Sequence, residues 1–222
     1  MPHVSWEYGY TGKNVVVAVL DSGTNFYHYA IRNNLWTAEK DGETIHGWNV
    51  INNNSDILDE YGHGTHCAGI VCGSNDTGVA PDAQLMTVKV VGRTGTGSVA
   101  QMLSGVQFAI ENGADVISMS LGFKSNQITT AQKEEIREAF DKVLESGIVV
   151  CAAAGNDGNS NGAPNNIDYP AACPSPWRNP DQTLEGGLSS VICVGANDLE
   201  ASSKGPSTWQ DTKYNEYPYT KD

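Results

Sequence analysis

The chain has 222 residues and a formal net charge of −13; 39% of its residues are hydrophobic and 18% are charged. These values predict a globular protein with a sizeable core and exclude an intrinsically disordered chain. The acidic balance argues against nucleic acid as a partner, because no basic stripe exists to neutralise phosphates. No apolar run is long enough to cross a bilayer, so we expect no membrane partner either.

Five short apolar runs predict buried strands, because they are rich in valine and isoleucine and do not alternate with polar residues. In chain order they span residues 14–21, 84–91, 115–121, 147–154 and 190–196. Between them, apolar residues at helical spacing predict helices over 97–113 and 130–147. Strands that alternate with helices indicate a three-layer α/β fold, with a mostly parallel sheet between helices.

The rest of the chain shows no internal repeat and no low-complexity linker, so we expect residues 1–222 to form a single domain. Residues 155–189 are rich in glycine, asparagine and proline and predict a long loop, of the kind that is usually functional or mobile. The five cysteines are odd in number and lack the close pairing of a zinc site. We expect mostly reduced, structural thiols, with Cys67, Cys151 and Cys193 as small buried hydrophobes.

Two motifs place ionisable side chains where chemistry is expected. The first predicted strand ends in VAVLDSG, which brings Asp21 to the carboxyl edge of the sheet, although an aspartate after a strand often only caps a turn. The motif HGTHCAGIVCG predicts a helix with His63 at its accessible start, and we interpret His66 as a packed core histidine. A metalloprotease zinc site needs histidines four apart around a glutamate, whereas these are three apart without one.

A third motif, VVCAAAGNDG, ends an apolar strand in small residues that lead to Asn156. Small residues allow a peptide to approach the backbone closely, and an asparagine amide is suited to stabilise an oxyanion. An isolated asparagine at such a position more often only tolerates a left-handed turn.

Together these motifs resemble the subtilisin-like serine peptidases. The resemblance runs from about Tyr10 to Ala196 and includes, in family order, VVVAVLDSG, GHGTHCAGI, GVAPDAQLMTVKVV, ADVISMSLG and CAAAGN. The cysteine in HGTHCAG is similar to the proteinase K branch. The resemblance implies a subtilisin-like fold and a serine endopeptidase that hydrolyses peptide bonds by an Asp–His–Ser mechanism.

The resemblance also implies the role of each catalytic side chain. Asp21 orients and stabilises the imidazolium of His63, His63 is the general base, and Asn156 donates to the oxyanion. The implied partner is a peptide or protein substrate in extended conformation, bound as an added strand.

The implied substrate-binding residues form two edges and one wall of the main specificity pocket. The edges are Gly95, Thr96 and Gly97 on one side and Ser120, Leu121 and Gly122 on the other; the wall is Ala153, Ala154 and Gly155. Since Leu121 is apolar and no charge is evident, we expect this pocket to prefer an apolar or aromatic side chain, with Tyr169 to Ala171 also shaping it.

The sequence departs from the family where the nucleophile should be. The family carries its serine in a glycine–threonine–serine–methionine–alanine stretch that opens a late helix, and no such run exists between Gly155 and Asp222. Ser207, for example, precedes a tryptophan and polar residues. We therefore expect a C-terminally incomplete catalytic domain that lacks the serine-bearing segment, with a propeptide upstream, and that is inactive as it stands.

Further expectations concern metals, location and other functions. The position of an acidic calcium ligand in many relatives falls on Ala30, and the loop 72–81 is short, so we expect the usual calcium site to be lost, with no metal and no cofactor. The family favours an extracellular location, but MPHVSWEYGY is no signal peptide, so the compartment stays open. One alternative is a non-catalytic peptide-binding relative. A nucleotide-binding domain conflicts with the lack of a glycine-rich loop after the first strand.

Overall fold

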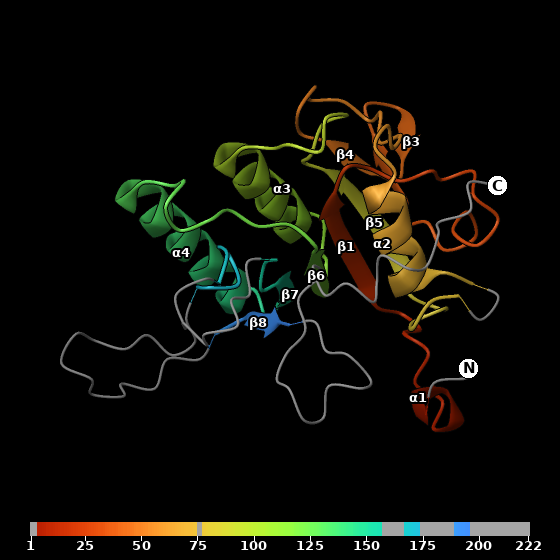
Figure 1. Ribbon diagram of the computed structural model, residues 1–222. Coiled ribbons are helices and arrows are strands. Elements are labelled where there is room, and N and C mark those ends of the chain that lie inside the picture. The colour runs from red at the N-terminus through yellow and green to blue at the C-terminus, as the bar shows by residue number, and fades with distance from the viewer. Residues whose placement is uncertain (1–3, 75–76, 157–166, 174–188, 196–222) are drawn as a thin grey trace, which may run out of the picture.

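The computed structural model describes residues 4–74, 77–156, 167–173 and 189–195, and the structural statements below concern these residues (Figure 1). The elements in chain order are α1 (Val4–Glu7), β1 (Val16–Asp21), β2 (Ala38–Lys40), β3 (Glu43–Ile45), β4 (Gly47–Asn49), α2 (His63–Cys72), β5 (Gln84–Lys89), α3 (Val99–Glu111), β6 (Val116–Met119), α4 (Thr130–Glu145), β7 (Val149–Ala153) and β8 (Val191–Val194). All five predicted strands and the three predicted helices, which are α2, α3 and α4, are confirmed. The short elements α1, β2, β3 and β4 were not predicted.

Six of the strands form one sheet in the order β4-β5-β1-β6-β7-β8, and each neighbouring pair is parallel. Strands β2 and β3 form a separate antiparallel hairpin. The chain runs outward from β1 to β5 and then returns past β1 to β6, so the winding direction reverses beside β1. Ligands of open parallel sheets bind at the carboxyl ends of the strands at such a reversal.

Helices cover the sheet on two sides, with α2 on one face and α3 and α4 on the other (Figure 1). Side chains of β1 alternate between two buried clusters: Val17 and Val19 pack in the cluster that includes Ala68 of α2. Ala18 and Leu20 belong to the cluster that extends over α3 and α4. The predicted α/β architecture with helices on both sides of a parallel sheet is therefore confirmed.

Helices α3 and α4 both begin with a complete capping box. Ser98 accepts from the backbone of Gln101, whose side chain bonds back to the Ser98 backbone, and Thr129 and Gln132 repeat the arrangement. Such reciprocal bonds satisfy backbone donors that the first turn of a helix leaves unpaired. The residue before α2, Gly62, has no side chain to cap the helix and adopts a left-handed conformation with φ of 99°.

The five cysteines are all free thiols. Cys67, Cys72 and Cys173 are buried, and burial raises the pKa of Cys72 and of Cys173 to about 12, so these thiols stay protonated. Cys193 is exposed, so its expected burial is wrong: it lies on β8, which among the described residues has a sheet neighbour on one side only.

None of the helices in the described ranges combines the length and the apolar character that a membrane span requires.

Candidate active site

The predicted catalytic side chains lie where the winding of the sheet reverses. Asp21 is the last residue of β1 and His63 is the first residue of α2, the helix that packs on β1. Strands β5 and β6 flank β1, so the segments that follow them, with Gly95–Gly97 and Ser120–Gly122, lie on either side of Asp21. Topology alone thus brings residues far apart in sequence to one edge of the sheet.

Asp21 and His63 form a direct hydrogen-bonded pair, as the sequence predicted. The Nδ1 atom of His63 lies 2.8 Å from Oδ1 and 2.9 Å from Oδ2 of Asp21. The Asp21 carboxylate is almost fully buried, at 3% side-chain exposure, and also accepts from the Ser22 backbone N–H at 2.7 Å. The His63 side chain is 45% exposed, so the carboxylate fixes Nδ1 while the ring edge reaches the solvent.

This pairing changes the acid–base behaviour of the imidazole. The hydrogen bond to Asp21 is the main cause that raises the pKa of His63 to about 10; the contact with Cys67 adds to the rise, and burial opposes it. The Cys67 sulfur lies 3.8 Å from Nδ1 and 3.9 Å from Nε2. The site therefore stabilises the imidazolium, the form that a general base takes after it has accepted a proton.

A close approach between α2 and β1 makes this geometry possible. A side chain at Gly64 would have its Cβ 2.2 Å from the backbone oxygen of Gly23, so only glycine lets the helix start so near the strand end. The Gly64 backbone N–H donates to Ser22 Oγ at 2.9 Å. Glycine at position 64 therefore serves the packing of α2 on the end of β1.

Asp59 ties the start of α2 to the end of β1, and the sequence analysis missed it. One of its carboxylate oxygens accepts from the Ser22 hydroxyl at 2.9 Å and from the Gly62 N–H at 2.8 Å. The other accepts from the hydroxyl and the N–H of Thr65 at 2.6 and 2.9 Å. Burial alone would raise the pKa of Asp59, but the hydrogen bonds from Thr65, Gly62 and Tyr61 outweigh it and hold the pKa below 3.8.

A cleft of about 490 Å³ brings most of the predicted site together. Its lining includes Asp21, His63 and Asn156, together with both predicted substrate edges, Gly95–Gly97 and Ser120–Gly122. It also includes Tyr61, which the sequence analysis did not select. A Cβ on Gly95 would lie 2.6 Å from the Tyr61 ring, so this ring packs directly on the first edge.

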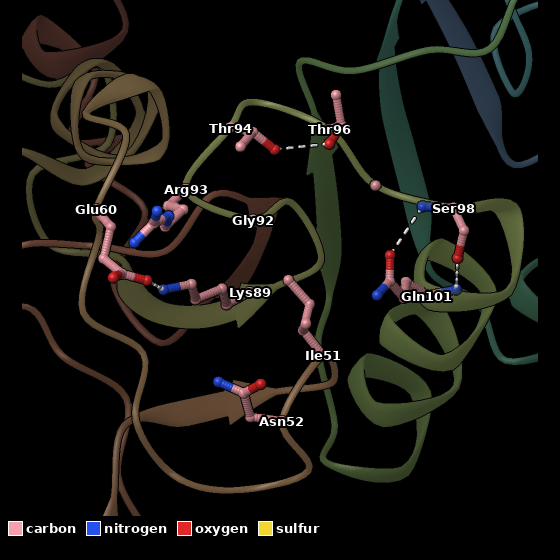
Figure 2. A pocket seen from close by; sticks show the side chains of 11 residues that line it. Ile51, Asn52, Glu60, Lys89, Gly92, Arg93, Thr94, Thr96, Ser98 and Gln101 are labelled. Atoms are coloured by element: carbon pink, nitrogen blue, oxygen red, sulfur yellow. Dashed lines mark hydrogen bonds and ion pairs between the residues drawn. The ribbon is translucent and has the colours of Figure 1, made fainter.

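The edge that contains Thr96 also borders a second pocket, of about 460 Å³, which shares Thr96, Gly97 and Ser98 with the cleft (Figure 2). In it, the Nζ atom of buried Lys89 donates to Glu60 at 3.0 Å and to the Leu58 carbonyl at 2.7 Å. These bonds attach the segment that leads to Tyr61 and His63 to the end of β5. The pocket thus lies between these bonds and the first edge of the cleft.

The predicted pocket wall, Ala153–Gly155, does not line the cleft itself but contacts the segment 168–169. The Asp168 N–H donates to the Ala154 carbonyl at 2.9 Å. The Asp168 carboxylate lies beside Gly122 and Gly155. Tyr169 to Ala171 were predicted from the sequence to shape the pocket, whereas Asp168, the residue before them, was not.

The structure also corrects the interpretation of His66 and leaves the metal predictions open. His66 is exposed, so its interpretation as a core histidine is wrong; it lies on the solvent side of α2. Potential ligand atoms of Asp21, His63 and Cys67 all lie within 4.8 Å of one another, but a cation there would compete with the Asp21–His63 hydrogen bond. Ala30 is buried and its carbonyl accepts from Ser74 at 2.7 Å; the loss of the calcium site stays a prediction.

Comparisons with known proteins show which family the chain belongs to. The chain matches the Subtilase family over residues 12–215. It is 37% identical over 213 residues to subtilisin DY of Bacillus licheniformis, covering 94% of this chain and 71% of that protein. It is 32% identical over 217 residues to the minor extracellular protease Epr of Bacillus subtilis (strain 168), covering 96% of this chain and 30% of Epr.

A solved structure is similar as well. The crystal structure of a cold adapted subtilisin-like serine proteinase matches with a TM-score of 0.64 and 29% identity, covering 86% of this chain and 57% of that one. The chain thus spans less than two thirds of Epr and of this solved protein. The family match nevertheless extends over most of the chain, and the chain belongs to the subtilase family of serine proteases.

Proposed function

We propose that this chain contributes the general base, its carboxylate partner and the oxyanion donor of a serine endopeptidase. The observation that carries the proposal is the Asp21–His63 pair, with a separation of 2.8 Å, in a cleft that Asn156 also lines. Family membership supports a protein or peptide as the substrate. The cleft has two rims, with Gly95–Gly97 and Ser120–Gly122, between which an extended peptide pairs as an added strand.

In the proposed mechanism each side chain has one task. Asp21 accepts the Nδ1–H of His63, which fixes the ring and leaves Nε2 to take the proton of a serine hydroxyl. The serine oxygen attacks the peptide carbonyl, and the Asn156 amide donates to the oxyanion that forms. His63 then returns the proton to the leaving amine, and water hydrolyses the acyl-enzyme. His63 starts this cycle in its neutral form, and the bond to Asp21 that raises its pKa stabilises the imidazolium that forms.

The nucleophilic serine is proposed to lie outside the printed sequence, since the glycine–threonine–serine–methionine–alanine run of the resemblance has no counterpart in it. On this proposal residues 1–222 alone are inactive. Asp21, His63 and Asn156 can at most hold a water molecule, which gives the weak catalysis that remains when a triad member is removed.

The test compares residues 1–222 with the same chain extended by the next stretch of its open reading frame. The extended protein should hydrolyse peptides and react with a serine-directed phosphonate, whereas the printed chain should do neither. His63→Ala in the extended protein should reduce turnover by up to about 10⁶-fold, as expected for loss of a triad histidine. The matched control is His66→Ala, on the exposed side of the same helix, which should retain nearly full activity.

Two outcomes contradict the proposal. One is an extended protein that binds peptides without cleaving them, which favours the alternative of a non-catalytic peptide-binding relative. The other is phosphonate labelling and turnover by the printed chain, which means that one of its own serines is the nucleophile.

A further inference from the structure

A carboxylate lies between the two backbone segments that flank the expected specificity pocket. A Cβ built on Gly122 would lie 2.6 Å from the Cβ of Asp168, and one built on Gly155 would lie 2.7 Å from its Oδ2. Side chains at either glycine would therefore collide with Asp168. The two glycines leave open a space that the Asp168 side chain occupies.

The backbone holds Asp168 in this position from both sides. Its N–H donates to the Ala154 carbonyl at 2.9 Å, on the segment that leads to Gly155. The next residue, Tyr169, exchanges two backbone hydrogen bonds with Phe123, at 2.8 and 2.9 Å, on the segment that follows Gly122. The segment with Asp168 thus bridges the end of β7 and the end of β6, and a side chain there has little freedom to leave.

We infer that Asp168, placed between Gly122 and Gly155, selects substrates with a basic side chain, arginine or lysine, immediately before the cleaved bond. This inference rests on the proposed peptidase function and adds the substrate class. It replaces the expectation of an apolar preference, which considered Leu121 and overlooked the charge next to Tyr169.

The electrostatic surroundings support a cationic ligand. Asp168 is partly buried, and a carboxylate that is shielded from water attracts an ammonium or guanidinium group more strongly than an exposed one. A guanidinium can also bind a carboxylate through two parallel hydrogen bonds. The net charge of −13 attracts basic peptides at longer range.

The first test uses the extended protein and two peptides that differ only in the residue before the cleaved bond, arginine or phenylalanine. The wild type should have the higher kcat/KM for the arginine peptide. Asp168→Asn keeps the shape and removes the charge, and it should lower kcat/KM for the arginine peptide about 30-fold or more, with little change for the phenylalanine peptide. Asp82→Asn, an exposed carboxylate before the amino end of β5, should change neither value.

Two results overturn the inference while the peptidase function stands. One is a higher kcat/KM of the wild type for the phenylalanine peptide, and the other is an equal decrease of kcat/KM for both peptides in Asp168→Asn. If the extended protein cleaves neither peptide, the proposed function fails, and a second measurement decides about Asp168. Benzamidine, a cationic mimic of an arginine side chain, should bind the 1–222 chain in a calorimetric or NMR titration. Asp168→Asn should weaken benzamidine binding about 30-fold, as it does kcat/KM for the arginine peptide, whereas Asp82→Asn should leave it unchanged. Equal binding by the wild type and both variants overturns the inference.

Discussion

The two halves of the six-stranded sheet differ in how one face is covered. A row of laterally paired residues on the α2 face runs across the sheet from Thr87 through Val19, Ser118 and Cys151 to Ile192. Thr87 and Val19 are 1% and 2% exposed, whereas Ile192 is 53% exposed. Among the described residues, α2 covers β1 and β5, and this face is progressively more open toward β8.

We call the part of the sheet with β5 and β1 the closed half and the part with β7 and β8 the open half, and the candidate site is divided between them. Asp21 and His63 belong to the closed half, where β1 and α2 pack tightly and Asp59 joins them. Asn156 follows β7 in the open half, where Val149 and Val194 are about half exposed. We infer that the Asp21–His63 geometry is set by packing within the described chain, while the surroundings of Asn156 depend on what covers the open face.

The largest expected effect comes from matched truncations on the α2 face of the two halves. Leu85→Ala removes a fully buried side chain from β5 and should lower the free energy of unfolding by about 2–5 kcal/mol. Ile192→Ala on β8 should cost less than about 1 kcal/mol, because half of that side chain is already exposed. Urea unfolding of the 1–222 chain measures both values. Equal losses would show that the face of β8 is covered in solution, and would remove the distinction between the halves.

The sequence predicted the closed half well, for a physical reason. Continuous valine-rich runs and helical spacing are local patterns, and a parallel sheet gives them one consistent arrangement. Asp21 and His63 were predicted as site residues because Asp21 is the last residue of such a run and His63 is the first residue of another. Their contact followed from topology, since Asp21 ends β1 and His63 begins α2, the helix that packs on β1.

The sequence predicted less where contacts are set by loops. Asp59 has no periodic pattern around it; its importance comes from the hydrogen bonds that it accepts from Ser22 and Thr65. Asp168 follows a long irregular stretch, and only the fold brings it beside Gly122 and Gly155. The exposure of Ile192 was also missed, because an apolar run predicts a strand without showing which helix covers it.

A smaller effect on the free energy of unfolding is expected for Asp59, whose hydrogen bonds join β1 and α2 in the closed half. Asp59→Ala leaves the N–H groups and hydroxyls of its partners without an acceptor and should cost about 1–3 kcal/mol of unfolding free energy. Asp56→Ala is the matched control in the same segment, because its exposed carboxylate accepts only a long bond, of 3.2 Å, from the Leu58 N–H in the described part of the chain. It should cost less than about 0.5 kcal/mol.

The pH dependence gives Asp59 a second readout. Its pKa is lower in the folded protein than the ordinary value of 3.8, so its stabilising contribution is present above that value and is lost as the pH falls through the folded pKa. The urea midpoint of the wild type should therefore fall more steeply with acid than that of Asp59→Ala. Parallel curves for the two proteins would contradict the bonding described here.

The smallest expected effect concerns the ion pair of the closed half. The pKa of His63 is raised from 6.5 to about 10, mainly by Asp21, so the pair contributes stability that is fully present below pH 6.5 and is lost as the pH rises toward about 10. Solvent screens the 45% exposed imidazole, so this loss should be modest and should shrink with added salt. An NMR titration of the ring should show Asp21→Asn lowering the pKa of His63 strongly and Cys67→Ala lowering it less, in the order of their contributions. A His63 that titrates near 6.5 in the wild type, or that responds more to Cys67→Ala than to Asp21→Asn, would mean that the closed half does not hold the pair as the structure shows it.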